Sequence, residues 1–221
     1  MKHLLLILGG IFLTTTVIAQ TVGDTHLDGL VLITSKQSED MDGVKGSPYL
    51  EEEFKRGTFA VEGKEPIGVF LRFDVSKDQM EIKTDLEAEE VYKLPMSRDA
   101  EYQLGGKIFR YGEILVDGKR IAGHFIEHYG GDSYRLLEKP VIDFTDAVKA
   151  TTGYDEDQPA RIEIDREYFI VDAKGNAKRV EIKHRDIKKA FEDDRSRDYL
   201  SDNKIRDLED LKDFVEFLDQ Q

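Results

Sequence analysis

The sequence predicts an α+β protein that is mainly β: an antiparallel β-meander curled into a half-barrel or sandwich, with a C-terminal amphipathic helical segment. From about residue 57, short runs alternate apolar and polar residues, as half-buried strands do. Turn signals separate these runs, and three of them, at Gly105, Gly118 and Gly131, are 13 residues apart. Past His184 the apolar spacing becomes helical. This order indicates a sheet completed by a helical tail.

The expected strands are defined by period-2 faces and by turn residues. One face of PIGVFLRFD carries Ile67, Val69, Leu71 and Phe73, and DQMEIKT adds Met80 and Ile82. Asp117-Gly118 stands between two apolar runs and favours the positive φ angles of a type I′ hairpin. A second hairpin should turn at Lys174 to Asn176, and a first strand should span Leu27 to Thr34. A short helix is expected near Asp146 to Ala150, followed by an acidic loop.

The tail contains one clearly amphipathic helix. Its apolar stripe consists of Leu208, Leu211, Phe214, Val215 and Leu218. Asp207 can accept hydrogen bonds from free backbone N–H groups at the start of this helix. We expect the stripe to pack on the sheet. If it is exposed instead, the same five residues are the candidate surface for docking a partner.

The N-terminus has the features of a secretory signal peptide. Lys2 precedes an apolar run from Leu4 to Leu13, which is shorter than the roughly 20 residues of a membrane-spanning helix. We expect cleavage after Ala19, a periplasmic or secreted protein, and no transmembrane segment after cleavage. The expected organisation is a signal peptide at 1–19, an N-terminal strand and polar loop at 20–56, an antiparallel β domain at 57–183, and helices packed on the sheet at 184–221.

Composition excludes several classes of function. The chain has 46 acidic and 32 basic residues, a formal net charge of −14, which repels phosphate backbones and anionic lipid. We therefore expect no binding to nucleic acid. Because there is no cysteine, disulfides, thiol catalysis and zinc-ribbon sites are excluded. No G-x-S-x-G elbow or phosphate-binding loop occurs, so the sequence predicts no cofactor and favours a protein that is not an enzyme.

The segment HFIEH, residues 124 to 128, fits the H-x-x-E-H pattern of inverted zinc peptidases. In a zinc-dependent hydrolase, His124 and His128 would bind the metal and Glu127 would act as the base. Both histidines reach one ion only on a helix, and Gly123 and Gly130 leave room for less than two turns. In a strand the two Cα atoms would be about 13 Å apart, at about 3.3 Å per residue.

We therefore interpret HFIEH as part of a strand. The expected faces are Ile121, Phe125 and Tyr129 on one side and Ala122, His124, Ile126 and His128 on the other. The acidic clusters at 38–43 and 154–158 could supply oxygen ligands to calcium, but neither has the D-x-D-x-D-G spacing. Calcium binding is left open.

Two stretches resemble a known group of proteins. One contains Gly46, Ser47, Pro48, Tyr49, Leu50, Phe54 and Gly57, and the other ends in Glu209, Asp210 and Leu211 before Phe214. In both, the chain resembles an uncharacterised group of signal-peptide-bearing proteins from Gram-negative bacteria of the Bacteroidetes group. The resemblance implies export, a β-rich body and a helical tail, and it brings no activity. The Pro-Tyr-Leu segment itself indicates a structural anchor that covers one end of the core.

The leading functional hypothesis is an exported, non-enzymatic protein that acts by macromolecular binding, with a protein partner in the cell envelope. Two alternatives remain. One is the zinc-dependent hydrolase that would use His124, Glu127 and His128. The other is a small-ligand carrier with its site inside the curled sheet. The oligomeric state is not predicted.

Overall fold

The structure is a computed structural model that describes residues 33–34, 43–94, 96–150 and 156–220. The expected signal peptide, its cleavage site, most of the expected first strand and most of the acidic cluster at 38–43 lie outside these residues. So do two of the five residues of the acidic cluster at 154–158. Within the described residues, no helix has both the length and the apolar character needed to cross a membrane.

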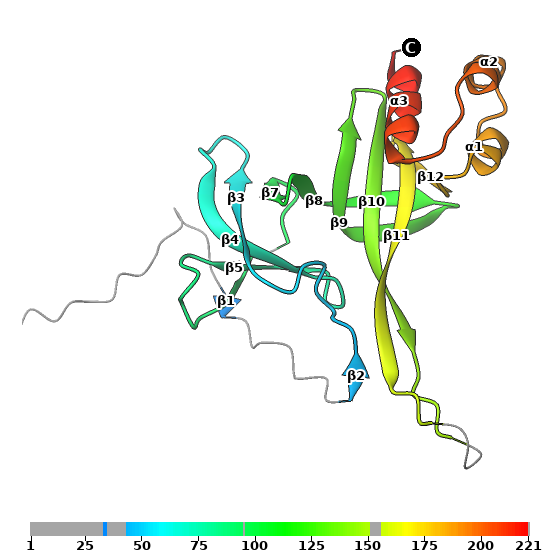
Figure 1. The fold of residues 1–221 in the computed structure, drawn as a ribbon. Helices are drawn as coiled ribbons and strands as arrows, with labels where there is room; N and C mark the ends of the chain where they lie inside the picture. The colour runs from blue at the N-terminus through cyan, green and yellow to red at the C-terminus, as the bar shows by residue number, and fades with distance from the viewer. Residues whose placement is uncertain (1–32, 35–42, 95, 151–155, 221) are drawn as a thin grey trace, which may run out of the picture. The chain divides into compact units, whose positions relative to one another are not determined.

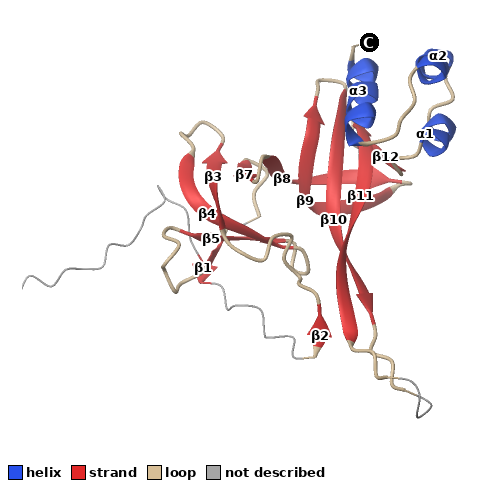
Figure 2. Ribbon diagram, in the orientation of Figure 1, coloured by secondary structure: helices blue, strands red, loops and turns tan. Residues whose placement is uncertain are grey.

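The described residues form twelve strands and three helices, which confirms a mainly β fold with a helical tail (Figures 1 and 2). The strands of the first half are β1 (Ile33–Thr34), β2 (Val44–Lys45), β3 (Lys55–Val61), β4 (Ile67–Asp74), β5 (Gln79–Lys83), β6 (Tyr92–Lys93) and β7 (Ala100–Leu104). The second half has β8 (Lys107–Val116), β9 (Lys119–Gly130), β10 (Tyr134–Thr145), β11 (Ala160–Asp172) and β12 (Asn176–Val180). The helices are α1 (His184–Ala190), α2 (Asp194–Asp202) and α3 (Leu208–Asp219).

Strand β8 joins the two halves of the sheet. It pairs with β7 through Lys107 to Arg110, with β9 along most of its length, and with β12 at Leu115 and Val116. The pairings therefore run from β8 through β9, β10, β11 and β12 back to β8, so this part of the sheet curls around an interior. The sheet as a whole is not a closed barrel. Most pairs are antiparallel, but β12–β8 and β2–β11 are parallel, so the purely antiparallel prediction is wrong there.

Strands β10 and β11 have an apolar cluster on each face. Successive side chains of a strand point to opposite faces, so neighbouring residues belong to different clusters. Leu137 and Phe169 belong to the inner cluster, whereas Leu136 and Ile170 face the helices. The inner cluster consists of Ile114, Phe125, Leu137, Phe169, Val171 and Ala177. The helix-facing cluster consists of Leu136, Ile170, Val180, Ile187, Phe191, Leu200, Ile205, Leu211, Phe214, Val215 and Leu218. These two clusters make β10 and β11 the centre of the C-terminal half.

The apolar stripe of α3 packs on the sheet. Leu211, Phe214, Val215 and Leu218 are buried in the helix-facing cluster, and Leu208 is partly buried against it. Figure 1 shows α3 lying along β10. The N-cap prediction is confirmed, because the Asp207 side chain accepts a hydrogen bond from Asp210 N. The stripe is therefore core, and it leaves no exposed apolar face on α3 for docking.

Local turn predictions agree with the structure with one exception. Asp117 (φ 49°) and Gly118 (φ 74°) form the turn between β8 and β9, which fits type I′. The turn between β11 and β12 lies at Lys174 to Asn176, as expected. The short helix predicted near Asp146 to Ala150 is wrong. There the backbone of Val148 exchanges two hydrogen bonds with Gln158, so an antiparallel bridge between these two segments replaces the local helical bonds.

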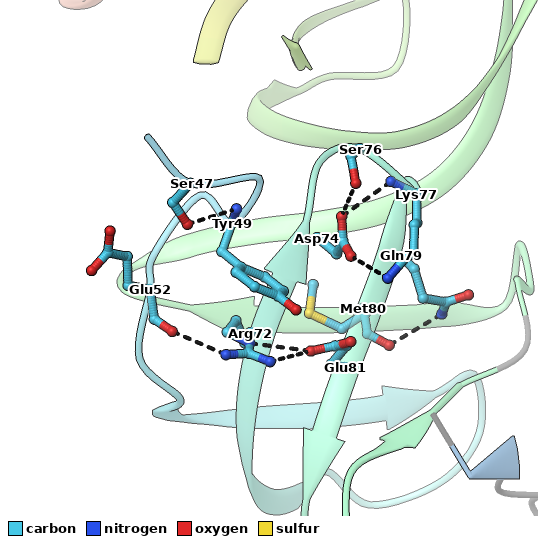
Figure 3. Close-up of polar contacts among 10 residues, drawn as sticks. All are labelled: Ser47, Tyr49, Glu52, Arg72, Asp74, Ser76, Lys77, Gln79, Met80 and Glu81. Carbon is cyan, nitrogen blue, oxygen red and sulfur yellow. Dashed lines mark hydrogen bonds and ion pairs between the residues drawn. The ribbon is translucent and has the colours of Figure 1, made fainter. Parts of the chain in front are cut away.

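The segment entering the sheet is anchored on a buried ion pair (Figure 3). Arg72 Nη2 lies 2.7 Å from Glu81 Oε2, and both residues are buried. The Tyr49 and Phe54 rings stack on the Arg72 guanidinium, at 3.7 and 4.4 Å from the ring centroids. Gly46 is required because a Cβ there would lie 2.1 Å from the Ile162 carbonyl oxygen. Backbone hydrogen bonds from Leu50 N to Phe73 O and from Val75 N to Pro48 O attach this segment to the end of β4, and the Tyr49 ring covers the ion pair.

A carboxylate in the β4–β5 turn ties the two halves of the sheet together. Asp78 Oδ1 accepts a hydrogen bond from His124 N at 3.0 Å, and Oδ2 lies 3.3 Å from Lys139 Nζ. Gly123 (φ 152°) is necessary because a Cβ there would lie 2.1 Å from Asp78 Oδ2. Burial raises the pKa of the Asp78 carboxyl, but the hydrogen bond with His124 and the charge of Lys139 outweigh it, so the pKa lies below its ordinary value.

A second carboxylate fastens the end of α3 to the β9–β10 turn. Asp219 Oδ1 accepts hydrogen bonds from Ser133 N at 2.6 Å and Tyr134 N at 2.7 Å. Tyr129 Oη donates to Asp219 Oδ2 at 3.1 Å. Asp219 lies at the C-terminal, negative end of the α3 dipole, which disfavours a carboxylate there. The three hydrogen-bond donors offset this effect and stabilise the ionised carboxylate. The backbone hydrogen bond from Tyr134 is the main reason that the pKa of Asp219 is lowered.

We predict that Gly123→Ala destabilises the fold by about 1–3 kcal/mol, because alanine disfavours this φ and its methyl group would displace the Asp78 carboxylate. The matched control is Gly68→Ala in β4, where a Cβ meets no atom within 4 Å. It should change the free energy of unfolding by about 0.5 kcal/mol or less. Urea denaturation measures both, and equal effects would refute the role assigned to Gly123.

We predict that Asp219→Asn lowers stability at neutral pH and loses this effect in acid. Because the folded-state pKa of Asp219 is lowered, its contribution is complete above the unfolded value of about 3.9 and disappears as pH falls through the folded value. Denaturation midpoints between about pH 6 and pH 2 test this. Asp213→Asn, on the exposed face of α3, is the control. A constant difference between Asp219→Asn and the wild type at every pH would contradict the mechanism.

Candidate ligand-binding site

The HFIEH segment lies in strand β9, which confirms the strand interpretation. His124 is buried, and its ring makes edge contacts with Phe73, Tyr102 and Tyr111. Its Nδ1 is 3.0 Å from the carbonyl oxygen of Asp78. His124 therefore forms part of the aromatic core between the two halves of the sheet.

The other two residues of the motif have different partners. Glu127 Oε1 lies 3.3 Å from Arg110 Nε, and His128 Nε2 lies 2.8 Å from Glu138 Oε2. The strand thus separates the three residues that a zinc site would need to bring together. Within the described residues, no group of three or more histidine, aspartate or glutamate side chains could hold a metal ion. The geometry required by the zinc-hydrolase hypothesis is not present there.

A β-bulge in β9 changes which residues share a face. Leu136 of β10 pairs with Tyr129, but Leu137 pairs with Glu127, so His128 is an extra residue. Because of this extra residue, the side chains before and after the bulge alternate between the two faces of the sheet in opposite phase. Phe125 therefore lies in the inner cluster, whereas Tyr129 packs on the helix-facing cluster. The predicted common face of Phe125 and Tyr129 is therefore wrong.

The bulge is stabilised by a buried carboxylate. Glu138 is fully buried and accepts from His128, with Arg166 Nε at 3.5 Å from its other oxygen. Burial raises the pKa of Glu138, but the hydrogen bond to His128 and the charge of Arg166 outweigh it, so the pKa lies below its ordinary value. We interpret Glu138, His128 and Arg166 as a structural group, because the carboxylate lies beside the two basic side chains.

A pocket of about 240 Å³ lies against β8, β9 and β10, and we call it the inner pocket. Its apolar wall is formed by three residues of the inner cluster, and its charged lining consists of three arginines and two glutamates. The residues used below are Arg110, Ile114, Phe125, Glu127, Arg135 and Leu137. Sheet register places them together because Arg110 is paired with Phe125 and Leu137 with Glu127.

A glycine of β8, Gly112, lines this pocket. Gly112 of β8 is paired with Gly123 of β9, where the Asp78 carboxylate occupies the space of a side chain. A Cβ at Gly112 would meet no atom within 4 Å, so the space beside this part of β8 is open. Glycines inside strands often mark a bend or a site where another group approaches. The inner pocket thus combines an apolar wall with open space beside the backbone of β8.

Arg135 distinguishes the inner pocket chemically. Arg110 contacts both Glu101 and Glu127, and Arg98 lies 3.8 Å from Glu113. Arg135 is partly buried, yet in the described part of the chain its guanidinium has no hydrogen bond or ion pair. Guanidinium groups bind carboxylates through two parallel hydrogen bonds. The sequence analysis did not identify Arg135, because nothing around it marks it as unpaired.

A larger groove of about 740 Å³ runs along β11, β12 and the start of α1. Its basic groups are already paired: Arg179 Nη2 is 2.6 Å from Glu167 and Lys183 Nζ is 2.5 Å from Glu181. Arg166 lies close to the buried Glu138. Because these charges are satisfied within the protein, the inner pocket is a stronger candidate for an anionic ligand than this groove.

Comparison with known proteins does not assign a family or a function to this chain. No protein-family model matches the chain, no curated protein matches it, and no solved structure matches it. The candidate site therefore rests on its own geometry and charge.

Proposed function

We propose that this protein is an exported carrier that binds a small anionic ligand in the inner pocket. The observation that carries the proposal is Arg135, which is partly buried beside an apolar wall and has no hydrogen bond or ion pair among the described residues, in a chain with a net charge of −14. Removing a charged group from water without a partner costs free energy. A bound carboxylate would supply the missing partner.

The size of the pocket limits the ligand. Ligand pockets usually have volumes of roughly 300–1,000 Å³, and the inner pocket has about 240 Å³. We therefore propose a ligand of a few heavy atoms beyond its carboxylate. The side chains of Phe125, Leu137 and Ile114 favour an apolar body for that ligand.

Export is the second part of the proposal. It is supported by the N-terminal sequence, in which Lys2, the apolar run from Leu4 to Leu13 and Ala19 fit a cleaved signal peptide. A carrier in the periplasm or outside the cell would need no cysteine and no cofactor. Macromolecular binding in the envelope remains a prediction, but α3 no longer motivates it, because the stripe from Leu208 to Leu218 packs in the core.

We predict that Arg135→Ala weakens binding of 4-methylpentanoate, a small branched carboxylate, by at least about tenfold. Loss of hydrogen bonds between charged groups, worth about 1.5–3 kcal/mol, has an effect of this size. Isothermal titration calorimetry measures the dissociation constant. Arg185→Ala removes an exposed arginine from α1 and is the charge-matched control, which should bind as the wild type does. No saturable binding to the wild type, or equal binding by Arg135→Ala, would reject the proposal.

A further inference from the structure

The inner pocket also contains a carboxylate with spare hydrogen-bonding capacity. Glu127 is 15% exposed, and among the described residues its one partner is Arg110, at 3.3 Å. That arginine is shared, because its Nη2 also contacts Glu101. An ionised carboxylate has about four acceptor positions. Glu127 therefore has acceptor positions left for a cationic group in the pocket.

Glu127 and Arg135 line the same pocket but do not form an ion pair with each other. Register explains the arrangement: Arg135 is paired with Gly130, and a Cβ at Gly130 would lie 2.8 Å from Glu127 Oε1. The Glu127 carboxylate thus lies over the backbone beside Arg135. Two opposite charges in one cavity, each incompletely paired, match a ligand that carries both charges.

The charges that line the pocket separate one kind of ligand from another. Arg98 and Arg110 lie near the carboxylates of Glu113 and Glu127. Arg135 is the cation of this lining that has no partner among the described residues. A simple carboxylate would pair with Arg135 but leave the acceptor positions of Glu127 unused. A zwitterion satisfies both groups.

We propose that the ligand of the inner pocket is a small zwitterion with an apolar body, such as an amino acid with an aliphatic side chain. This inference rests on the proposed function. The carboxylate of the ligand pairs with Arg135, its ammonium group donates to Glu127, and its apolar body packs against Phe125 and Leu137. The three features lie on neighbouring strands β9 and β10.

Three matched probes test the inference by calorimetry on the wild-type protein. L-Leucine carries both charges, 4-methylpentanoate lacks the amino group, and 3-methylbutylamine lacks the carboxylate. We expect leucine to bind at least about tenfold more tightly than either, the effect of about one charged hydrogen bond. If 4-methylpentanoate binds as tightly as leucine, the zwitterion inference is rejected and the anion carrier stands. If neither leucine nor 4-methylpentanoate binds, the zwitterion inference and the anion-carrier proposal are both rejected.

A variant then locates the ammonium site. Glu127→Gln keeps the shape of the side chain and removes its charge. It should reduce leucine binding to the level of 4-methylpentanoate and change the affinity for 4-methylpentanoate by no more than about twofold. Circular dichroism checks that the variant is folded. An undiminished preference for leucine in folded Glu127→Gln would overturn the assignment of Glu127, and the comparison of probes on the wild type stands without it.

Discussion

The hydrogen bond between the Asp78 carboxylate and the backbone of His124 is the contact on which the rest of the structure depends. It joins the β4–β5 turn to the middle of β9, two segments 46 residues apart. It also requires glycine at position 123, because Asp78 occupies the space of a side chain there. Once β9 is held in this position, His124 faces the aromatic core and Phe125 faces the inner cluster. The wall of the inner pocket follows from this division of faces.

Several buried and partly buried charges in the described residues belong to compact pairs. Arg72 pairs with Glu81 under two aromatic rings, Glu138 with His128, and Asp78 with Lys139. A buried charge without a partner is strongly unfavourable, so such pairs show which charges the fold satisfies by itself. Arg135 is only partly buried, and it has no hydrogen bond or ion pair among the described residues. In the proposed function, a ligand supplies that partner.

The helical tail supports the sheet that forms the pocket. Its apolar residues cover the face of β10 and β11 opposite the inner cluster, and Asp219 fastens the β9–β10 turn. Arg135 follows this turn directly, next to Tyr134, whose backbone N–H binds Asp219. In the proposed function, the tail contributes indirectly, by fixing the strand that carries Arg135. The apolar stripe that suggested a docking helix is used for packing.

The sequence by itself determined the features that depend on neighbouring residues. Period-2 runs located the strands, Asp117-Gly118 predicted the type I′ turn, Asp207 predicted a helix cap, and short glycine-bounded spacing placed HFIEH in a strand. These succeed because turn angles, caps and side-chain periodicity are local properties. Only the tertiary structure decided the parallel pairings, the loss of the helix near Asp146, the bulge at His128 and the isolation of Arg135. Each of these features depends on which backbone segments or charged groups, distant in the sequence, come into contact in the folded chain. The local sequence does not specify those contacts.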